Sequence, residues 1–203
     1  IEEFNLQGKE VIGIVSTIIS EIRGTFDFIK SMGILNKLMP EVDLNFIIVS
    51  RKSVSDEANK KTNDYEKAKM LINDLNISDK VIFTGFRRDA LSIIAAMDIV
   101  VVCNRFGALG RMSFEAMALG KPVVVTAGHS GRSEVVIDGV TAMVVPPADP
   151  GAIAQAIIQL FEDVNLLTRI SEQGRKYAHE NFDSEKNARK IEDIYLKVLA
   201  QKR

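Results

Sequence analysis

The sequence is poor in the residues that form disulfides or bind metals. Cys103 is the single cysteine among 203 residues, so the chain cannot form an internal disulfide, and we expect a reducing compartment, the cytoplasm. The two histidines, His129 and His179, lie far in the sequence from the cysteine and from any cluster of acids. This spacing gives no indication of a metal site.

Long apolar runs and an excess of charge of one sign are absent as well. No stretch approaches the roughly 20 apolar residues that a membrane-spanning helix needs, and the first residues lack the basic and apolar regions of a signal peptide. The 26 basic side chains nearly balance the 27 acidic ones, so no general positive field would hold nucleic acid or an anionic membrane. We therefore expect neither a membrane span nor a nucleic-acid partner, and function must lie in local sites.

What the sequence has is a regular alternation of short apolar runs and helical patterns. Hydrophobic residues make up 46% of the chain, enough for a full core in a single domain over residues 1–203. Apolar runs rich in β-branched residues begin at Val11, Phe46, Val81, Ile99, Val123 and Met143. Helical periodicity is found at residues 25–39, 64–75, 90–97, 111–119, 149–163, 165–182 and 184–202. The polar residues 50–64 are expected to form an exposed loop that leads into a helix.

Apolar runs this continuous are typical of strands that are buried on both faces of a parallel sheet. The alternation therefore predicts an α/β fold: a doubly wound, mostly parallel sheet of about six strands, with helices on both faces and a helical carboxyl-terminal segment. In such a fold, ligands bind beyond the carboxyl ends of the strands.

The segment GRMSFEAMALGKPVVV, residues 110–125, changes from helical to strand periodicity and places one acid, Glu115, just inside the helix start. Together with VIFTGFRRDALSIIAAMDIVVV, residues 81–102, and with the segment up to residue 157, it resembles the donor-binding, carboxyl-terminal half of retaining GT-B glycosyltransferases of the group 1, family 4 type. The resemblance covers nearly the whole chain and implies a Rossmann-like half of a GT-B fold that binds a nucleotide sugar. It also implies an amino-terminal acceptor-binding domain, and since this sequence begins without methionine and has no counterpart of that domain, we expect a fragment.

The resemblance assigns Glu115 a role at the nucleotide. In the family, a helix amino terminus faces the diphosphate, and the glutamate at the position of Glu115 accepts hydrogen bonds from the ribose hydroxyls. The helix start would offer the backbone N–H groups of Gly110, Arg111 and Met112 to the phosphates, and Gly110 has no side chain to keep a phosphate oxygen away. The alternative interpretation is that Glu115 only complements the helix dipole.

The loop before this helix departs from the family pattern. The family's other glutamate, which holds the donor sugar, should stand eight positions before Glu115, where this sequence has Gly107; an alternative alignment puts Asn104 there. Neither residue is an acid, although an asparagine can still hydrogen-bond a sugar hydroxyl. Leu109, between Gly107 and the helix, belongs to the same expected donor-binding loop.

The expected diphosphate clamp departs from the pattern too. The family usually follows its first strand with a Gly-Arg pair and then a Lys-Gly pair; here Ser16 and Thr17 replace the first pair, and Arg23-Gly24 matches the second. A Thr17 hydroxyl can donate a hydrogen bond but brings no charge, while Arg23 can grip a phosphate through its planar fork. Gly13, within the first strand, is also expected in the donor site.

Two further segments match the family. Gly85, Phe86 and Arg87 follow the third strand, where the family's backbone contacts the base edge, so they are candidates for the base pocket; the alternative is a plain strand-to-helix loop. The stretch GHSGRSE, residues 128–134, resembles a Gly-Gly-x-x-Glu turn of the family, in which Glu134 starts a short helix.

By the resemblance, the catalytic residues are Arg23 and Glu115, which stabilise the donor while its sugar is transferred with retention at the anomeric carbon. The family needs no metal, and the sequence contains no Asp-x-Asp motif, so we expect no cofactor besides the substrate, a nucleoside-diphosphate sugar. The half-enzyme alone is expected to bind the donor weakly and to transfer nothing. The main alternative is a degenerate, non-catalytic module for nucleotide-sugar binding or assembly; an epimerase of the same overall fold would need histidines and acids in the cleft that are not found.

The last predicted helix carries an apolar stripe at helical spacing, formed by Ile191, Ile194, Tyr195 and Val198. The resemblance implies that this helix returns to the acceptor-binding domain. Without that domain, we expect the stripe to pack on its own domain or to mediate contacts in crystals or in solution.

Overall fold

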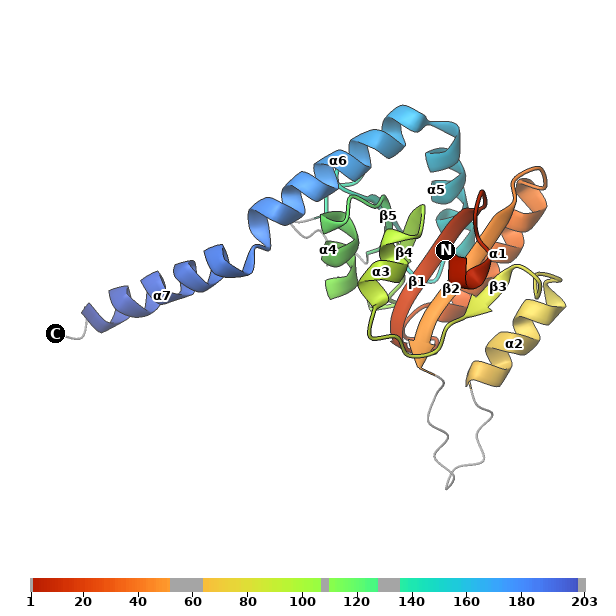
Figure 1. Ribbon diagram of the computed structural model, residues 1–203, viewed down its shortest axis with the longest axis horizontal. Helices are drawn as coiled ribbons and strands as arrows, with labels where there is room; N and C mark the ends of the chain where they lie inside the picture. Colours follow the sequence, from red (N-terminus) through yellow and green to blue (C-terminus); the bar gives the residue numbers. More distant parts are fainter. Residues whose placement is uncertain (1, 52–63, 107–109, 128–135, 201–203) are drawn as a thin grey trace, which may run out of the picture.

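The computed structural model describes residues 2–51, 64–106, 110–127 and 136–200. In this part of the chain, six strands form one sheet in the order β3-β2-β1-β4-β5-β6, and every neighbouring pair is parallel (Figure 1). The strands are β1 (Glu10–Ile18), β2 (Leu44–Arg51), β3 (Val81–Phe83), β4 (Ile99–Val102), β5 (Val123–Thr126) and β6 (Met143–Val145). The order runs outward in both directions from the β1–β4 pair, so the doubly wound parallel α/β fold predicted from the sequence is confirmed.

Helices cover both faces of this sheet. The helices of the described chain are the short 3-10 helix η1 (Glu2–Phe4), α1 (Thr25–Leu38), α2 (Asp64–Asp74), α3 (Ala90–Ala95), α4 (Arg111–Ala118), α5 (Pro150–Glu162), α6 (Val164–Asn181) and α7 (Ser184–Ala200), of which α7 lies outside the layers. Side chains of α1, α2 and α5 share one core with strand residues such as Ile12, while α3 and α4 share the second core with the adjacent Val11. Successive strand side chains thus enter opposite cores, which is why the strands read as continuous apolar runs.

The carboxyl end of β1 is irregular. Its register with β2 holds as far as the pair Val15–Val49 and then shifts before Ile18. The shift falls on Ser16 and Thr17, and the Ser16 hydroxyl donates a hydrogen bond to the Ile18 carbonyl at 2.9 Å. An irregular strand end redirects side chains, and this one lies at the sheet edge where ligands bind in such folds.

The end of β2 corrects one expectation. Ser50 and Arg51 were assigned to a loop, but both belong to β2, and Ser50 is buried. The assignment was wrong because the neighbouring β1 continues far enough for Ile18 to pair with Arg51, which a local polar pattern does not reveal. Helix α2 begins at Asp64, and residues 52–63 lie outside the described part of the chain.

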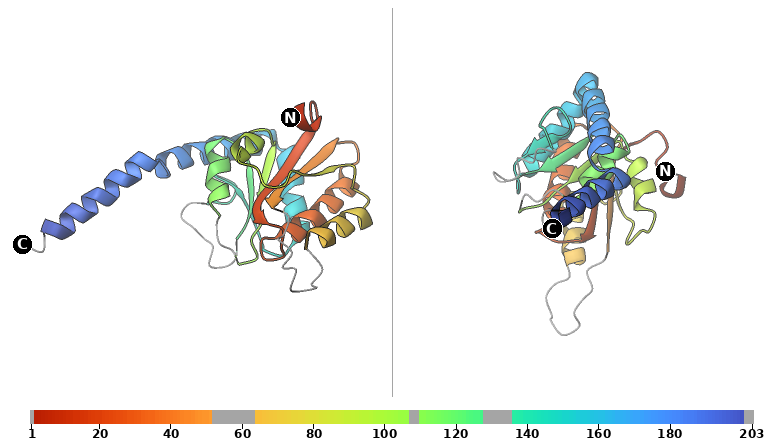
Figure 2. Two further views of the ribbon diagram at one scale, coloured as in Figure 1. Left: turned by 60° about the horizontal axis from the view of Figure 1, so that its bottom comes forward. Right: turned by 90° about the vertical axis from the view of Figure 1, so that its left-hand side faces the viewer.

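Helix α7 extends away from the rest of the domain, as two views show (Figures 1 and 2). None of its described residues is buried, and the stripe of Ile191, Ile194, Tyr195 and Val198 is 47–67% exposed. Of the two outcomes expected for the stripe, packing on its own domain is therefore wrong, because α7 starts beyond the end of α6 and none of its described residues is buried. The other outcome, contacts in crystals or in solution, stays a prediction. Among the described helices, none is both long and apolar enough to cross a membrane.

Candidate functional site

A cavity of about 700 Å³ opens at the carboxyl ends of the strands. Its walls come from the ends of β1, β2 and β4, the loop between β3 and α3, and the first turn of α4. This is the place where the strand order changes direction, between β1 and β4, and where ligands bind in open α/β sheets. The cavity therefore lies where the sequence predicted a ligand site.

The described lining of the cavity is strongly basic, although the whole chain has a net charge of only −1. Four of these lining residues are arginines, Arg23, Arg51, Arg87 and Arg111, and none is an aspartate or a glutamate. Hydroxyl and amide groups of Ser16, Thr17, Ser50 and Asn104 complete the polar part of the lining. Such a surface favours an anionic ligand.

Arg23 lies on a tight loop between β1 and α1. Gly24 has a φ of 68°, and a Cβ at this position would overlap the Cβ of Cys103 at the end of β4, so only glycine fits. The amide of Arg23 donates a hydrogen bond to the hydroxyl of Ser20 at 3.3 Å. Within the described residues, the Arg23 guanidinium has no ion pair, so its charge is available to a ligand.

The first turn of α4 faces the cavity through Gly110, Arg111 and Met112. Gly110 is the N-cap residue, and among the described residues a Cβ there would come within 4 Å of Val102 alone, at 3.9 Å. The first N–H groups of a helix have no acceptor within the helix. This end of α4 is therefore suited to bind the oxygens of an anion.

Glu115 lies in the second turn of α4 and is not among the residues that line the cavity. One of its carboxylate oxygens, Oε1, is 2.9 Å from Nε of Arg111, and its side chain is 29% exposed. The description of Glu115 as an acid just inside the helix start is wrong, and an interaction with the helix dipole would be weak there, because that effect fades after the first turn. The side chain of Arg111 is 85% exposed.

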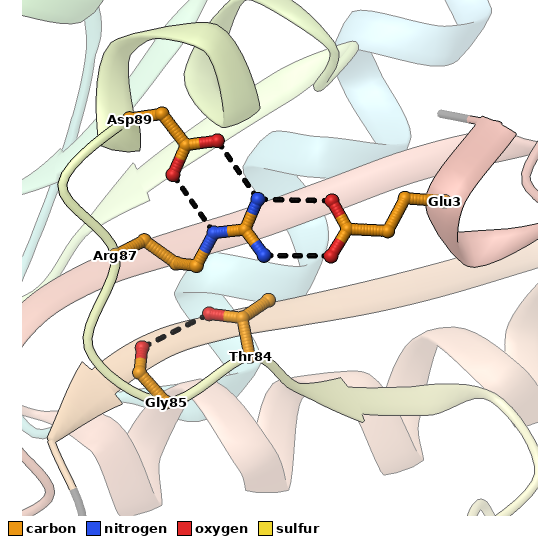
Figure 3. Close-up of polar contacts among 5 residues, drawn as sticks. All are labelled: Glu3, Thr84, Gly85, Arg87 and Asp89. Carbon is orange, nitrogen blue, oxygen red and sulfur yellow. Dashed lines mark hydrogen bonds and ion pairs between the residues drawn. The ribbon is translucent and has the colours of Figure 1, made fainter.

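The guanidinium of Arg87 is fully engaged by two carboxylates (Figure 3). It binds Glu3 through contacts of 2.6 and 2.9 Å and Asp89 through two contacts of 2.8 Å. These hydrogen bonds raise the pKa of Arg87 and lower the pKa of both acids. Arg87 lines the cavity, but its charge is largely balanced, so it contributes shape and backbone groups more than free charge.

The other candidates for the base pocket have partners too. The Gly85 carbonyl accepts a hydrogen bond from the Thr84 hydroxyl at 3.1 Å (Figure 3). Phe86 is 59% exposed, and the Arg51 guanidinium carbon lies 4.5 Å from its ring centroid. Arg51 was not predicted as a site residue because the polar segment that begins at Ser50 predicted a loop, whereas Arg51 ends β2. The Phe86–Arg51 pair offers a flat surface at the rim of the cavity.

The remaining predicted site residues are placed as follows. Thr17 and Asn104 line the cavity, and the Asn104 side-chain oxygen accepts a hydrogen bond from the Phe106 amide at 3.0 Å. Gly13 is not a lining residue: it lies within β1, and a Cβ there would overlap the side chain of Met97. Its glycine is thus explained by close packing. Residues 107–109 and 128–135, which include Gly107, Leu109 and Glu134, lie outside the described part of the chain.

Two groups near the cavity were not predicted as functional. Burial raises the pKa of the Cys103 thiol, so it stays protonated and is a poor nucleophile. Arg105 binds Asp27 in a bidentate pair of 2.8 and 2.9 Å, across 78 residues of sequence. No local pattern in the sequence signals this pair.

Comparisons with known proteins agree with this geometry. Residues 2–177 match the model of the family described as glycosyl transferases group 1. Over 132 residues, 65% of this chain and 37% of the relative, the chain is 34% identical to the lipopolysaccharide core biosynthesis glycosyltransferase LpsE of Rhizobium meliloti. It is 26% identical to the N-acetyl-alpha-D-glucosaminyl L-malate synthase of Bacillus anthracis, over 98% of this chain and 48% of that protein.

The solved structures include Anabaena HepE in complex with UDP-glucose, which superposes with a TM-score of 0.82 at 25% identity and covers 97% of this chain and 51% of that one. The chain thus spans about half the length, or less, of these three proteins. The family match covers 176 of the 203 residues, since it runs from residue 2 to residue 177. The chain belongs to the glycosyl transferases group 1 family.

Proposed function

We propose that this chain is the nucleotide-sugar-binding domain of a retaining glycosyltransferase and that its ligand is a nucleoside-diphosphate sugar. The observation that carries the proposal is the cavity at the β1–β4 switch point, whose described lining holds four arginines beside the start of α4; two of them, Arg23 and Arg51, have no ion pair among the described residues. A diphosphate is the anion that such a lining fits. The complex of HepE with UDP-glucose supports a donor of this class.

Arg23 is the residue that we propose to act on the leaving group. As the bond between sugar and diphosphate breaks, negative charge grows on the diphosphate, and a cation placed there stabilises the transition state. Arg23 lines the cavity and has no ion pair among the described residues, so it can respond to that charge. The α4 start would hold the same phosphates through backbone N–H groups. In this proposal the protein supplies the positive charge, and no metal ion takes part.

For Glu115 we propose a contact with the ribose that requires a local exchange. Arg111 occupies one oxygen of the Glu115 carboxylate, and its side chain is long and mostly exposed. When a diphosphate binds, Arg111 can turn toward the phosphates, and the released carboxylate can accept hydrogen bonds from ribose hydroxyls. Nucleotide binding then replaces one ion pair by two sets of charge-assisted hydrogen bonds.

The partner of this domain is, in our proposal, an amino-terminal acceptor-binding domain of the same protein, which completes a cytoplasmic enzyme. Its sugar acceptor would enter between the two domains. Two observations support this: the chain spans about half the length of the Bacillus anthracis synthase and of HepE, and α7 presents an exposed apolar stripe. The stripe would be covered when α7 packs on the second domain.

A degenerate module that only binds a nucleotide sugar is the second candidate. It is favoured by the sequence departures at Gly107 and Thr17, and by the pairing of Arg87 with two acids, which leaves fewer free cations around the cavity. Both candidates predict nucleotide binding, and only the first predicts transfer once the acceptor domain is present.

Calorimetric titration of the chain with UDP, GDP and ADP tests the proposal. We expect weak binding of at least one nucleotide and loss of most of that binding in Arg23→Gln, with Arg169→Gln as a control whose arginine bonds the distant Gly139 carbonyl. The absence of binding to all three nucleotides would refute the proposal. Sugar transfer by the chain alone would refute the need for a second domain, and no transfer by the full two-domain protein would favour the degenerate module.

A further inference from the structure

Arg105, in the loop between β4 and α4, contacts the chain on both sides of Arg23. Its amide donates a hydrogen bond to the Ile22 carbonyl at 3.1 Å, and its Nη1 lies 3.7 Å from Oε2 of Glu21. Its Nε and Nη2 donate to the two oxygens of Asp27 at 2.9 and 2.8 Å. One residue thereby joins the loop that carries Arg23 to the first turn of α1.

The pair with Asp27 is the strongest of these contacts. The Asp27 side chain is only 4% exposed, and a carboxylate so deeply buried needs a partner that satisfies both oxygens. The planar fork of arginine does this with two parallel hydrogen bonds, which a lysine cannot form. The same hydrogen bonds raise the pKa of Arg105, so its charge is permanent.

Arg105 does not itself provide the charge that faces the ligand. Its guanidinium is committed to Asp27 and Glu21, and it is not among the residues that line the cavity. Arg23 does line the cavity, and it stands between two fastened neighbours: Ile22, held by the Arg105 amide, and Gly24, packed against Cys103. The position of the Arg23 backbone is therefore set by contacts to the loop that follows β4.

We propose that Arg105 is a positioning residue for the diphosphate site: through Asp27 and Ile22 it holds Arg23 toward the cavity. The inference rests on the proposed function, since it takes the ligand to be a nucleoside diphosphate. It assigns the affinity for the phosphates in part to a residue that does not touch them.

Binding of UDP and of uridine, measured by NMR titration, separates positioning from general damage. In Arg105→Gln we expect UDP affinity to fall on the order of tenfold, as in Arg23→Gln, while uridine affinity is unchanged because uridine has no phosphates. The double variant should bind UDP no more weakly than Arg23→Gln alone, since both changes remove the same interaction. Arg105→Lys should restore only part of the affinity, because it keeps the charge but loses the fork.

A second variant tests whether a loss of UDP binding in Arg105→Gln comes from unfolding. Arg105→Gln leaves the Asp27 carboxylate buried without a partner, so Arg105→Gln combined with Asp27→Asn removes the buried charge together with its partner. This variant should fold and should still show the tenfold loss for UDP. Arg169→Gln, which removes an arginine bonded to a distant loop carbonyl, should bind UDP like the unmodified chain.

Each outcome decides the inference. Additive losses from Arg23→Gln and Arg105→Gln would overturn it, and so would equal losses for UDP and uridine or unchanged UDP binding in the folded variant with Asp27→Asn. If the unmodified chain binds none of UDP, GDP and ADP, the proposed function fails and the inference fails with it. If the unmodified chain binds UDP and the Arg105 variants bind it equally well, only the inference fails.

Discussion

Ser113 should destabilise the protein through its own hydroxyl. The residue lies in the first turn of α4 and is fully buried, and its Oγ has no hydrogen-bond partner in the described part of the chain. A buried hydroxyl without a partner costs about 1–3 kcal/mol, and alanine is also the better helix former by about 0.5 kcal/mol. Ser113→Ala removes one oxygen atom and should raise the free energy of unfolding by about 1–2 kcal/mol, which for a chain of this length raises Tm by about 2–4 °C per kcal/mol.

Ser31 provides the matched control. It is equally buried and also helical, in α1, but its hydroxyl donates a hydrogen bond to the Phe28 carbonyl at 2.7 Å. Ser31→Ala gains the same helix propensity and loses a bond worth about 1 kcal/mol, so it should be slightly less stable than the unmodified chain. The difference between the two variants, about 2 kcal/mol, isolates the hydrogen bonding of the hydroxyl because the propensity terms cancel.

Urea denaturation followed by far-ultraviolet circular dichroism measures both variants under the same conditions. The reasoning is refuted if Ser113→Ala loses as much stability as Ser31→Ala, because the Ser113 hydroxyl would then have a partner in the folded protein. A change in the denaturant slope would show that the compared states differ, so the slopes must agree before the midpoints are compared.

Three further predictions follow from the site and from the sheet. Glu115→Gln should weaken UDP binding by about 1–3 kcal/mol, roughly tenfold or more, and the 2′-deoxyribose analogue, which binds the unmodified chain less well, should lose much less affinity in this variant. Gly24→Ala puts a side chain at a left-handed φ and against Cys103, so it should cost about 2–4 kcal/mol of stability. Gly139→Ala is the control: its φ is 67° but no atom lies within 4 Å of the added Cβ, so it should cost about 1–2 kcal/mol. Glu10 is exposed, yet partial desolvation and the charge of Asp98 raise its pKa in the folded chain, so ionisation of Glu10 slightly opposes folding, and the stability of the protonated form is lost as pH rises through the folded pKa. Glu10→Gln should therefore raise Tm at neutral pH and give no advantage in acid, below the unfolded pKa of about 4.

Each of these predictions has a result that contradicts it. Equal penalties for the missing 2′-hydroxyl in the unmodified chain and in Glu115→Gln would remove Glu115 from the ribose site. Equal losses of stability in Gly24→Ala and Gly139→Ala would show that the contact with Cys103 is not tight. A Tm difference between Glu10→Gln and the unmodified chain that grows toward acid pH would reverse the sign derived for Glu10.

The layers of the fold follow from local patterns along the chain. Val11 and Ile12 point into opposite cores, and because both are apolar the strand reads as one continuous run, which is the signature of a buried parallel strand. The helices follow from an equally local signal, the 3.6-residue period. The motif around Glu115 also pointed to the family, since a glycine before a helix and an acid within it are read along a few neighbouring residues.

Which arginines have ion pairs, in contrast, depends on contacts between residues far apart in the sequence. Arg87 and Arg23 look alike in the sequence, yet Arg87 meets Glu3 from 84 residues away, while Arg23 has no such ion pair in the described part of the chain. Likewise, Gly13 was expected at the ligand and is explained by its contact with Met97. Ion pairs and close contacts depend on distances between side chains that the folded sheet brings together. No repeating pattern in the sequence indicates which side chains these are. Local patterns therefore fixed the elements, while the fold decided that Arg87 is held by two acids and that Arg23 has no ion pair among the described residues.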